Sequence, residues 1–176
     1  MPMGELGNHL FGVRILGPLL AGLLAAGCVV APPPGTPPPP AVDILTGDAR
    51  ASRYGSNAAE MLAHPEARES VRRLFGSDQN QAMAARLSRS AADFFGNPSP
   101  TRVLRIAGAD YLAATGCVPS ACSTHPGLLL IRVDGKDLFA RLDEGGFSHY
   151  YGFGTGVEMT PTTLALLDAA WRALRP

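Results

Sequence analysis

The sequence predicts an α+β domain: an antiparallel sheet of about five strands with helices packed on one face, and a disulfide-closed loop between two of the strands. Helical spacing of apolar residues dominates the first part of the domain, and short strands separated by turn residues follow it. Helical spacing then returns at the C-terminal end. With 46% hydrophobic residues in a chain of 176, there is enough apolar surface to build one such core.

Two helices are predicted before the strands. The first covers 65–75 and ends before Gly76. The second begins at Ser77 or Asp78 and runs to Phe95, because apolar residues recur on one face at Met83, Leu87, Ala91 and Phe94. Stripes of this kind are typical of packing against a core rather than of a cofactor site.

Short strands are predicted next, at 101–106, 111–116, 127–133, 137–143 and 147–153. The third of these segments (GLLLIRV) is nearly all apolar, which is typical of a central strand covered on both faces. Asp134-Gly135 and Gly145-Gly146 predict tight turns on either side of the fourth strand.

A closing helix is predicted from Thr160, an N-cap residue, with Pro161 in the first helical position. Its apolar face consists of Leu164, Leu167, Trp171 and Leu174. Asp168 and Arg172 are spaced i,i+4, so we expect them to pair on the exposed side of this helix.

Residues 1–27 are predicted to be a secretory signal. The apolar run at 15–26 (ILGPLLAGLLAA) is shorter than the ~20 residues that a membrane-spanning helix needs. Small residues then lead directly into Cys28, and this arrangement resembles the lipobox of bacterial lipoproteins, in which the cysteine is acylated and becomes the first residue. The resemblance implies a lipid anchor at Cys28. A plain signal peptide and a retained membrane anchor are the alternatives.

Residues 28–42 are predicted to be a tether between the lipidated cysteine and a domain at 43–176. The segment 31–40 (APPPGTPPPP) should adopt polyproline II, a semi-rigid spacer of roughly 30 Å. Val29 stands where an aspartate would resemble an inner-membrane retention signal, so the resemblance favours the outer membrane. The domain would then lie in the periplasm or at the cell surface.

Charge and motifs exclude several classes of function. Lys+Arg and Asp+Glu both number 15, so there is no basic excess of the kind that nucleic-acid binding needs. The sequence contains no Gly-x-Ser-x-Gly, His-Glu-x-x-His or phosphate-loop motif. We therefore expect neither an enzyme nor a cofactor. Phe147, Tyr150 and Tyr151 could form an aromatic patch for a partner, but core packing of at least two of them is the better hypothesis.

The most specific feature is the pair Cys117 and Cys122 (CVPSAC), which lies between two predicted strands. In an oxidising envelope, two thiols this close in sequence should form a disulfide. Pro119 stiffens the closed loop further, and a rigid tip loses little entropy when it inserts into a partner. Two alternatives stay open: a purely structural clip, and a metal site that adds His125 and His149 to the two thiols.

The stretch 103–143 resembles the Ivy family, the periplasmic inhibitors of C-type lysozyme. The resemblance lies in a short turn, an aromatic-bearing strand that leads into a Cys-x₄-Cys loop, and an apolar strand and hairpin that follow. It implies that the loop inserts into the cleft of lysozyme. In the family, a histidine after the loop's proline meets the catalytic carboxylates. Here Cys117, Pro119 and Cys122 match the pattern, and Ser120 stands at the histidine position.

A serine hydroxyl can donate one hydrogen bond to a carboxylate, but it carries no positive charge. We therefore consider His125, three residues beyond the second cysteine, as a candidate to compensate. The expected partner-binding residues are Val118, Pro119, Ser120, Ala121 and His125. The leading hypothesis is an envelope lipoprotein that inhibits lysozyme or a related wall-degrading enzyme. The second is an envelope interaction or assembly lipoprotein that keeps the fold without inhibiting.

Overall fold

The computed structural model describes residues 38–79 and 86–175. The predicted signal sequence, Cys28 and most of the predicted tether lie outside these ranges. Within them, no helix is both long and apolar enough to cross a membrane.

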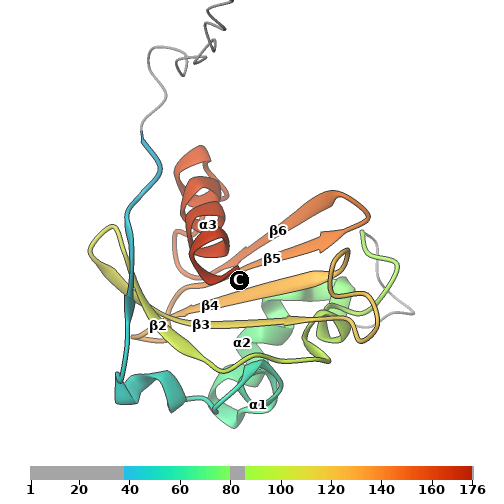
Figure 1. Ribbon diagram of the computed structural model, residues 1–176, viewed down its shortest axis with the longest axis horizontal. Coiled ribbons are helices and arrows are strands. Elements are labelled where there is room, and N and C mark those ends of the chain that lie inside the picture. Colours follow the sequence, from blue (N-terminus) through green and yellow to red (C-terminus); the bar gives the residue numbers. More distant parts are fainter. Residues whose placement is uncertain (1–37, 80–85, 176) are drawn as a thin grey trace, which may run out of the picture. The chain divides into compact units, whose positions relative to one another are not determined.

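The described residues form one six-stranded sheet in which sequence neighbours pair antiparallel, in the order β1-β2-β3-β4-β5-β6 (Figure 1). The strands are β1 Val42–Leu45, β2 Arg102–Ile106, β3 Ala109–Cys117, β4 Pro126–Arg132, β5 Leu138–Glu144 and β6 Phe147–Phe153. The α+β class and the antiparallel sheet are therefore confirmed. The additional strand, β1, is only four residues long and half-buried, too short for a recognisable alternation.

Three α-helices lie in the described ranges: α1 Ala58–Ala63, α2 Pro65–Phe75 and α3 Pro161–Leu174. The short 3₁₀ helices are η1 Ala49–Ser52, η2 Gly76–Gln79 and η4 Ala91–Phe95. Helices α2 and α3 begin at the predicted prolines, and the Thr160 hydroxyl accepts the Thr163 N–H as an N-cap does.

The helices cover both faces of the sheet, so the prediction that they share one face is wrong. Alternate side chains of β2, β3 and β4 enter two separate cores. One core contains Val103, Leu112 and Leu129 together with residues of α1, α2 and η4. The other contains Leu104, Leu128 and Leu130 with Leu167, Ala170 and Trp171 of α3. A strand as apolar as β4 requires cover on both sides, and α3 supplies the second cover.

The predicted helix from Ser77 or Asp78 to Phe95 is wrong in its described part. Residues 86–90 are not helical, and η4 starts afresh after Ser90, whose N–H donates to Asp93 at 3.1 Å. The Ser88 N–H donates to the Glu144 carboxylate instead of to a helical carbonyl. Serines offer such local alternatives to helix. Leu87, Ala91 and Phe94 are still buried, while Met83 lies outside the described residues.

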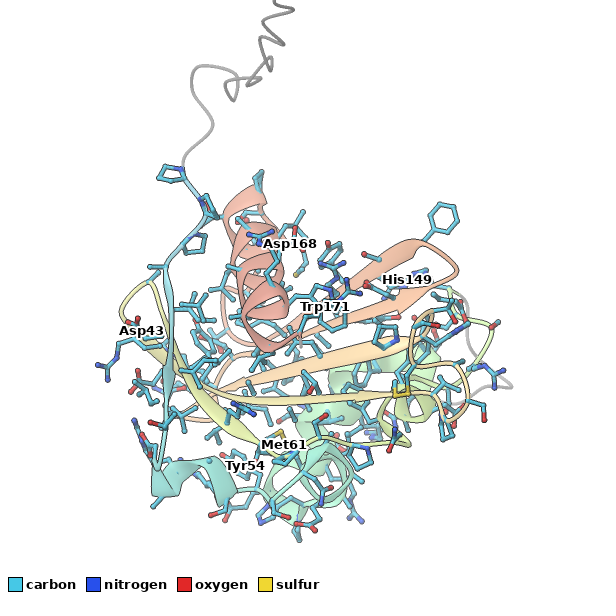
Figure 2. The ribbon with its side chains drawn as sticks, viewed as in Figure 1. Asp43, Tyr54, Met61, His149, Asp168 and Trp171 are labelled. Atoms are coloured by element: carbon cyan, nitrogen blue, oxygen red, sulfur yellow. A yellow bond between two sulfur atoms is a disulfide. The ribbon has the colours of Figure 1, made fainter. Side chains whose placement is uncertain are left out.

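Helix α3 is attached to the sheet through Asp168, so the expected pairing of Asp168 with Arg172 is wrong. The Asp168 carboxylate accepts hydrogen bonds from Arg141 Nη1 and from the Tyr150 hydroxyl, both at 2.8 Å. The Arg141 guanidinium lies 4.9 Å from the ring centroid of Trp171. Figure 2 labels Asp168 and Trp171 on this helix. A half-buried ion pair on β5 therefore replaces the exposed pair that helical spacing predicted.

This attachment gives a stability test with a matched control on the same helix. Asp168→Ala should lower the free energy of unfolding by about 1–3 kcal/mol, because it leaves Arg141 Nη1 and the Tyr150 hydroxyl without this acceptor. Arg172→Ala removes an exposed side chain and should change it by less than ~0.5 kcal/mol. Urea unfolding followed by circular dichroism measures both. Equal effects of the two variants would contradict the assignment.

Candidate functional site

The candidate site is the loop between the end of β3 at Cys117 and the start of β4 at Pro126. Cys117 and Cys122 form a disulfide, with their Cα atoms 4.8 Å apart, so the predicted bond is confirmed. In Figure 2 it is the yellow bond at the end of the sheet where β3 leads into the loop.

The loop backbone forms a tight turn inside the disulfide ring. The Ala121 N–H donates to the Val118 carbonyl at 3.0 Å, Pro119 occupies the second position of the turn, and Ser120 has φ +67°. These are the features of a type II turn, whose third position favours glycine or asparagine. The His125 N–H then donates to the Ala121 carbonyl at 2.8 Å, and the His125 carbonyl accepts the Val118 N–H at 3.0 Å. The ring is therefore closed by backbone hydrogen bonds as well as by sulfur.

The loop is anchored at its base and exposed at its tip. Val118 is only 4% exposed and belongs to the core, and Ala121 packs against the same core. Pro119 and Ser120 are exposed. Of the predicted binding residues, Val118 is thus unavailable to a partner in this conformation, and Pro119 and Ser120 form the accessible tip.

Residues 94–97 support the loop from behind, through contacts that only glycine permits. A Cβ atom on Gly116 would lie 2.8 Å from Phe95 Cα, and one on Gly96 would lie 2.9 Å from Pro119 Cδ. The Asn97 N–H donates to the Cys117 carbonyl at 2.9 Å. The connection after η4 therefore lies directly against β3 and the loop, and it limits movement of the tip.

The His125 side chain is held beside β5, away from the groups that Ser120 presents. Its exposed fraction is 21%. Nδ1 lies 2.7 Å from Thr124 Oγ1, Nε2 lies 3.8 Å from Glu144 Oε1, and the ring centroid lies 6.0 Å from that of Phe94. None of these hydrogen-bond, ionic or ring contacts involves Ser120. His125 therefore supports the C-terminal end of the loop beside Glu144 and does not lie at the tip.

Neither the metal alternative nor a serine–histidine arrangement has geometric support. Both cysteine sulfurs belong to the disulfide, and the described residues contain no cluster of three His, Cys, Asp or Glu side chains fit to hold a metal. Ser88 Oγ donates to Glu144 Oε1 at 2.5 Å, and His125 Nε2 lies 3.8 Å from the same oxygen, so the carboxylate and not the imidazole receives the hydroxyl hydrogen bond. A histidine must contact the hydroxyl directly to act as its general base.

Two of the three candidate aromatic residues pack into the domain, as expected. Tyr151 is 3% exposed, and its hydroxyl donates to Asp78 at 3.0 Å. Burial, with a further contribution from Asp78, raises the pKa of Tyr151 well above its usual value. Tyr150 packs against the core beneath α3. Phe147, by contrast, is 75% exposed.

These observations define a small α+β domain that presents one rigid, disulfide-closed loop at an end of an antiparallel sheet. Residues 66–170 match the family model described as inhibitor of vertebrate lysozyme (Ivy), and the chain belongs to this family. The matched segment runs from α2 into α3 and includes the whole loop. No curated protein and no solved structure matches the chain.

Sequence reasoning found the loop but missed the groups that hold it. Ser88 and Glu144 are distant in sequence and meet only in the fold. Gly116, directly before Cys117, carried a usable signal, because a glycine inside a strand often marks a close backbone approach.

The turn at Ser120 gives a second test of the structure. With a positive φ at this position, Ser120→Val should lower the free energy of unfolding by about 1–2 kcal/mol relative to Ser120→Gly. Thermal unfolding of the two variants beside the wild type measures the difference. If valine were as well tolerated as glycine, the turn would have to be of another type.

Proposed function

We propose that this chain is a lipid-anchored envelope protein that inhibits lysozyme, or a related wall-degrading enzyme, by inserting its Cys117–Cys122 loop into the cleft of that enzyme. The observation that carries the proposal is the exposed turn at Pro119 and Ser120, in a chain that belongs to the Ivy family. In this role the protein is an inhibitor and not an enzyme.

The rigidity of the loop favours insertion. Association is opposed by the entropy lost when flexible groups become ordered, so a tip with one conformation binds more tightly than a mobile one. Here the disulfide, the buried Val118 and the contact of Pro119 with Gly96 all restrict the tip before any partner arrives.

Ser120 determines how strongly the tip can engage acidic groups in a cleft. Its hydroxyl can donate one hydrogen bond to a carboxylate, and hydrogen bonds to charged groups contribute about 1.5–3 kcal/mol. It lacks the positive charge that the family's histidine brings to the same place. We therefore expect inhibition of a C-type lysozyme by this chain to be weaker than a histidine-bearing tip would give.

The proposed anchor places the domain where a wall-degrading enzyme acts. Each buried CH₂ group of a lipid contributes about 0.8 kcal/mol, so two or more acyl chains on Cys28 hold a protein stably on a membrane. The proline-rich segment at 31–40 then keeps the domain clear of the bilayer. Val29 stands where an aspartate would resemble an inner-membrane retention signal, so we propose the outer membrane as the site of the anchor.

One observation favours a second candidate, an envelope interaction or assembly lipoprotein that does not inhibit. The tip carries Ser120 instead of histidine, and His125 is occupied with Thr124 and Glu144. The tip therefore presents no cationic side chain to a catalytic carboxylate.

Inhibition of egg-white lysozyme decides between the two candidates. The full-length chain should slow lysis of a bacterial cell suspension at micromolar concentration. Ser120→His should inhibit at least tenfold more strongly, because a charged hydrogen bond replaces a neutral donor and because histidine tolerates positive φ better than most residues. Cys117→Ser/Cys122→Ser should abolish the effect and lower the free energy of unfolding by about 2 kcal/mol.

Ser123→His is the matched control, since it places an imidazole on an exposed residue just outside the disulfide ring. It should leave inhibition at the wild-type level. If neither the wild type nor Ser120→His slows any lysozyme at micromolar concentration, the inhibitory proposal fails and the assembly role takes its place.

The anchor is tested separately in a bacterial host. The wild type should incorporate a labelled fatty acid and sediment with outer membranes, whereas Cys28→Ser should do neither, because it lacks the thiol that is acylated. Cys28→Ser protein should still contain the Cys117–Cys122 disulfide by mass spectrometry. Membrane association of the Cys28→Ser protein without label would indicate a retained membrane anchor instead.

A further inference from the structure

Phe147 is the most exposed large apolar side chain in the described residues. Its exposed fraction is 75%, and the next is Met159 at 37%. Tyr150 and Tyr151, on the same strand, pack into the domain. Aromatic side chains are enriched at protein–protein interfaces, where those that become fully buried anchor the complex.

The backbone holds Phe147 in a defined position. It is the first residue of β6 and pairs with Glu144 across a two-residue turn made by Gly145 (φ +59°) and Gly146 (φ +91°). Positive φ at both central residues is the signature of a type I′ hairpin, the tightest connection between antiparallel strands. Like that of the loop tip, the backbone at Phe147 is therefore fixed before a partner binds.

Phe147 lies at the same end of the sheet as the disulfide loop. β3 ends and β4 begins at the loop, while β5 ends and β6 begins at the Gly145-Gly146 turn. Because neighbouring strands are antiparallel, both connections project from one end, as Figure 1 shows at the right-hand side of the sheet. Strand alternation also puts Phe147 on the same face as Tyr151, which shares a core with Val118 of the loop.

Glu144 links the two projections. Oε1 of Glu144, the strand partner of Phe147, lies 3.8 Å from His125 Nε2 and accepts the Ser88 hydroxyl at 2.5 Å. His125 in turn closes the loop through its backbone bonds to Val118 and Ala121. Movement of one projection relative to the other would break these contacts, so the two form parts of one surface.

We propose that Phe147 is a second anchor of this surface, and that it enters an apolar hollow on the rim of the enzyme cleft that receives the loop tip. This inference rests on the proposed function. It commits to a partner with two features: carboxylates inside a cleft, which meet Ser120, and an uncharged apolar depression beside the cleft, which meets the phenyl ring. His125 takes the role of a positioning residue between the two anchors rather than a contact at the tip.

The test uses the full-length chain, egg-white lysozyme, and the variants Phe147→Ala, Phe147→Trp and Met159→Ala. Phe147→Ala should raise the concentration needed for half-inhibition about tenfold to a hundredfold, because burial of a phenyl ring is lost. Phe147→Trp should retain inhibition within a few-fold of wild type, since it preserves an aromatic ring of similar reach. The thermal midpoints of both Phe147 variants should stay at the wild-type value, because the side chain is exposed in the free protein.

Met159→Ala is the matched control. Met159 is also an exposed apolar residue, but it lies beside Gly152 near the other end of β6, where a Cβ on that glycine would meet its sulfur at 2.8 Å. Its removal should leave inhibition unchanged.

The outcomes separate this inference from the function on which it rests. If the wild type inhibits and Phe147→Ala inhibits equally well, the second anchor is overturned and the loop mechanism stands. If Phe147→Ala changes only the oligomeric state in analytical ultracentrifugation, the residue contacts a second copy of this chain, and the inference is again overturned. If neither the wild type nor Ser120→His inhibits, both proposals fall together.

Discussion

The disulfide loop depends on a close backbone contact behind it. Residues 94–97 lie against β3 and β4 at Gly116 and Gly127, where added Cβ atoms would come within 2.8 Å of Phe95 Cα and 3.0 Å of the Phe94 carbonyl oxygen. Phe94 and Phe95 are buried, so this segment belongs to the core and is not a loose connection. Because protein interiors are densely packed, the contact prevents the base of the loop from moving toward Phe94 and Phe95.

The same contact explains why a disulfide ring of few residues can present a tip at all. Val118 anchors one side of the ring in the core, and Asn97 holds the Cys117 carbonyl on the other. Hydrogen bonds within the ring and to His125 satisfy part of its backbone, and its exposed residues are Pro119 and Ser120 at the turn and Cys122 beside them. In the proposed function, recognition would depend largely on Ser120, whose side chain projects from a left-handed backbone position and can change without disturbing the scaffold beneath it.

The elements that local signals define were predictable, and those that long-range contacts define were not. Helices α2 and α3 carry their own start signals, an N1 proline in each, and both begin where the sequence predicts. The predicted helix through residues 86–90 failed because Ser88 finds its partner in Glu144, 56 residues away. Asp168 pairs with Arg141 and not with Arg172 for a similar reason. An ion pair with the half-buried guanidinium on β5 is more stable than one with an exposed guanidinium on the same helix. The loop itself was predictable because two cysteines and a proline within six residues restrict the backbone locally. The orientation of His125 was not predictable, because it depends on contacts with Phe94 and Glu144, which are distant in sequence.

The position of His125 bears on how the binding surface works as a whole. At the tip, an imidazole would meet the partner directly, as the family's histidine does. Beside Glu144, the imidazole instead connects the end of β5 to the C-terminal end of the loop. This contact restrains the distance between the hairpin that carries Phe147 and the turn that carries Ser120. Two weak anchors held at a constant separation bind better than the same two on mobile loops, because the second contact then forms with little further loss of entropy. If both proposals hold, a chain without the charged tip recovers affinity through geometry, and it selects partners by the shape of the cleft rim as much as by the carboxylates within the cleft.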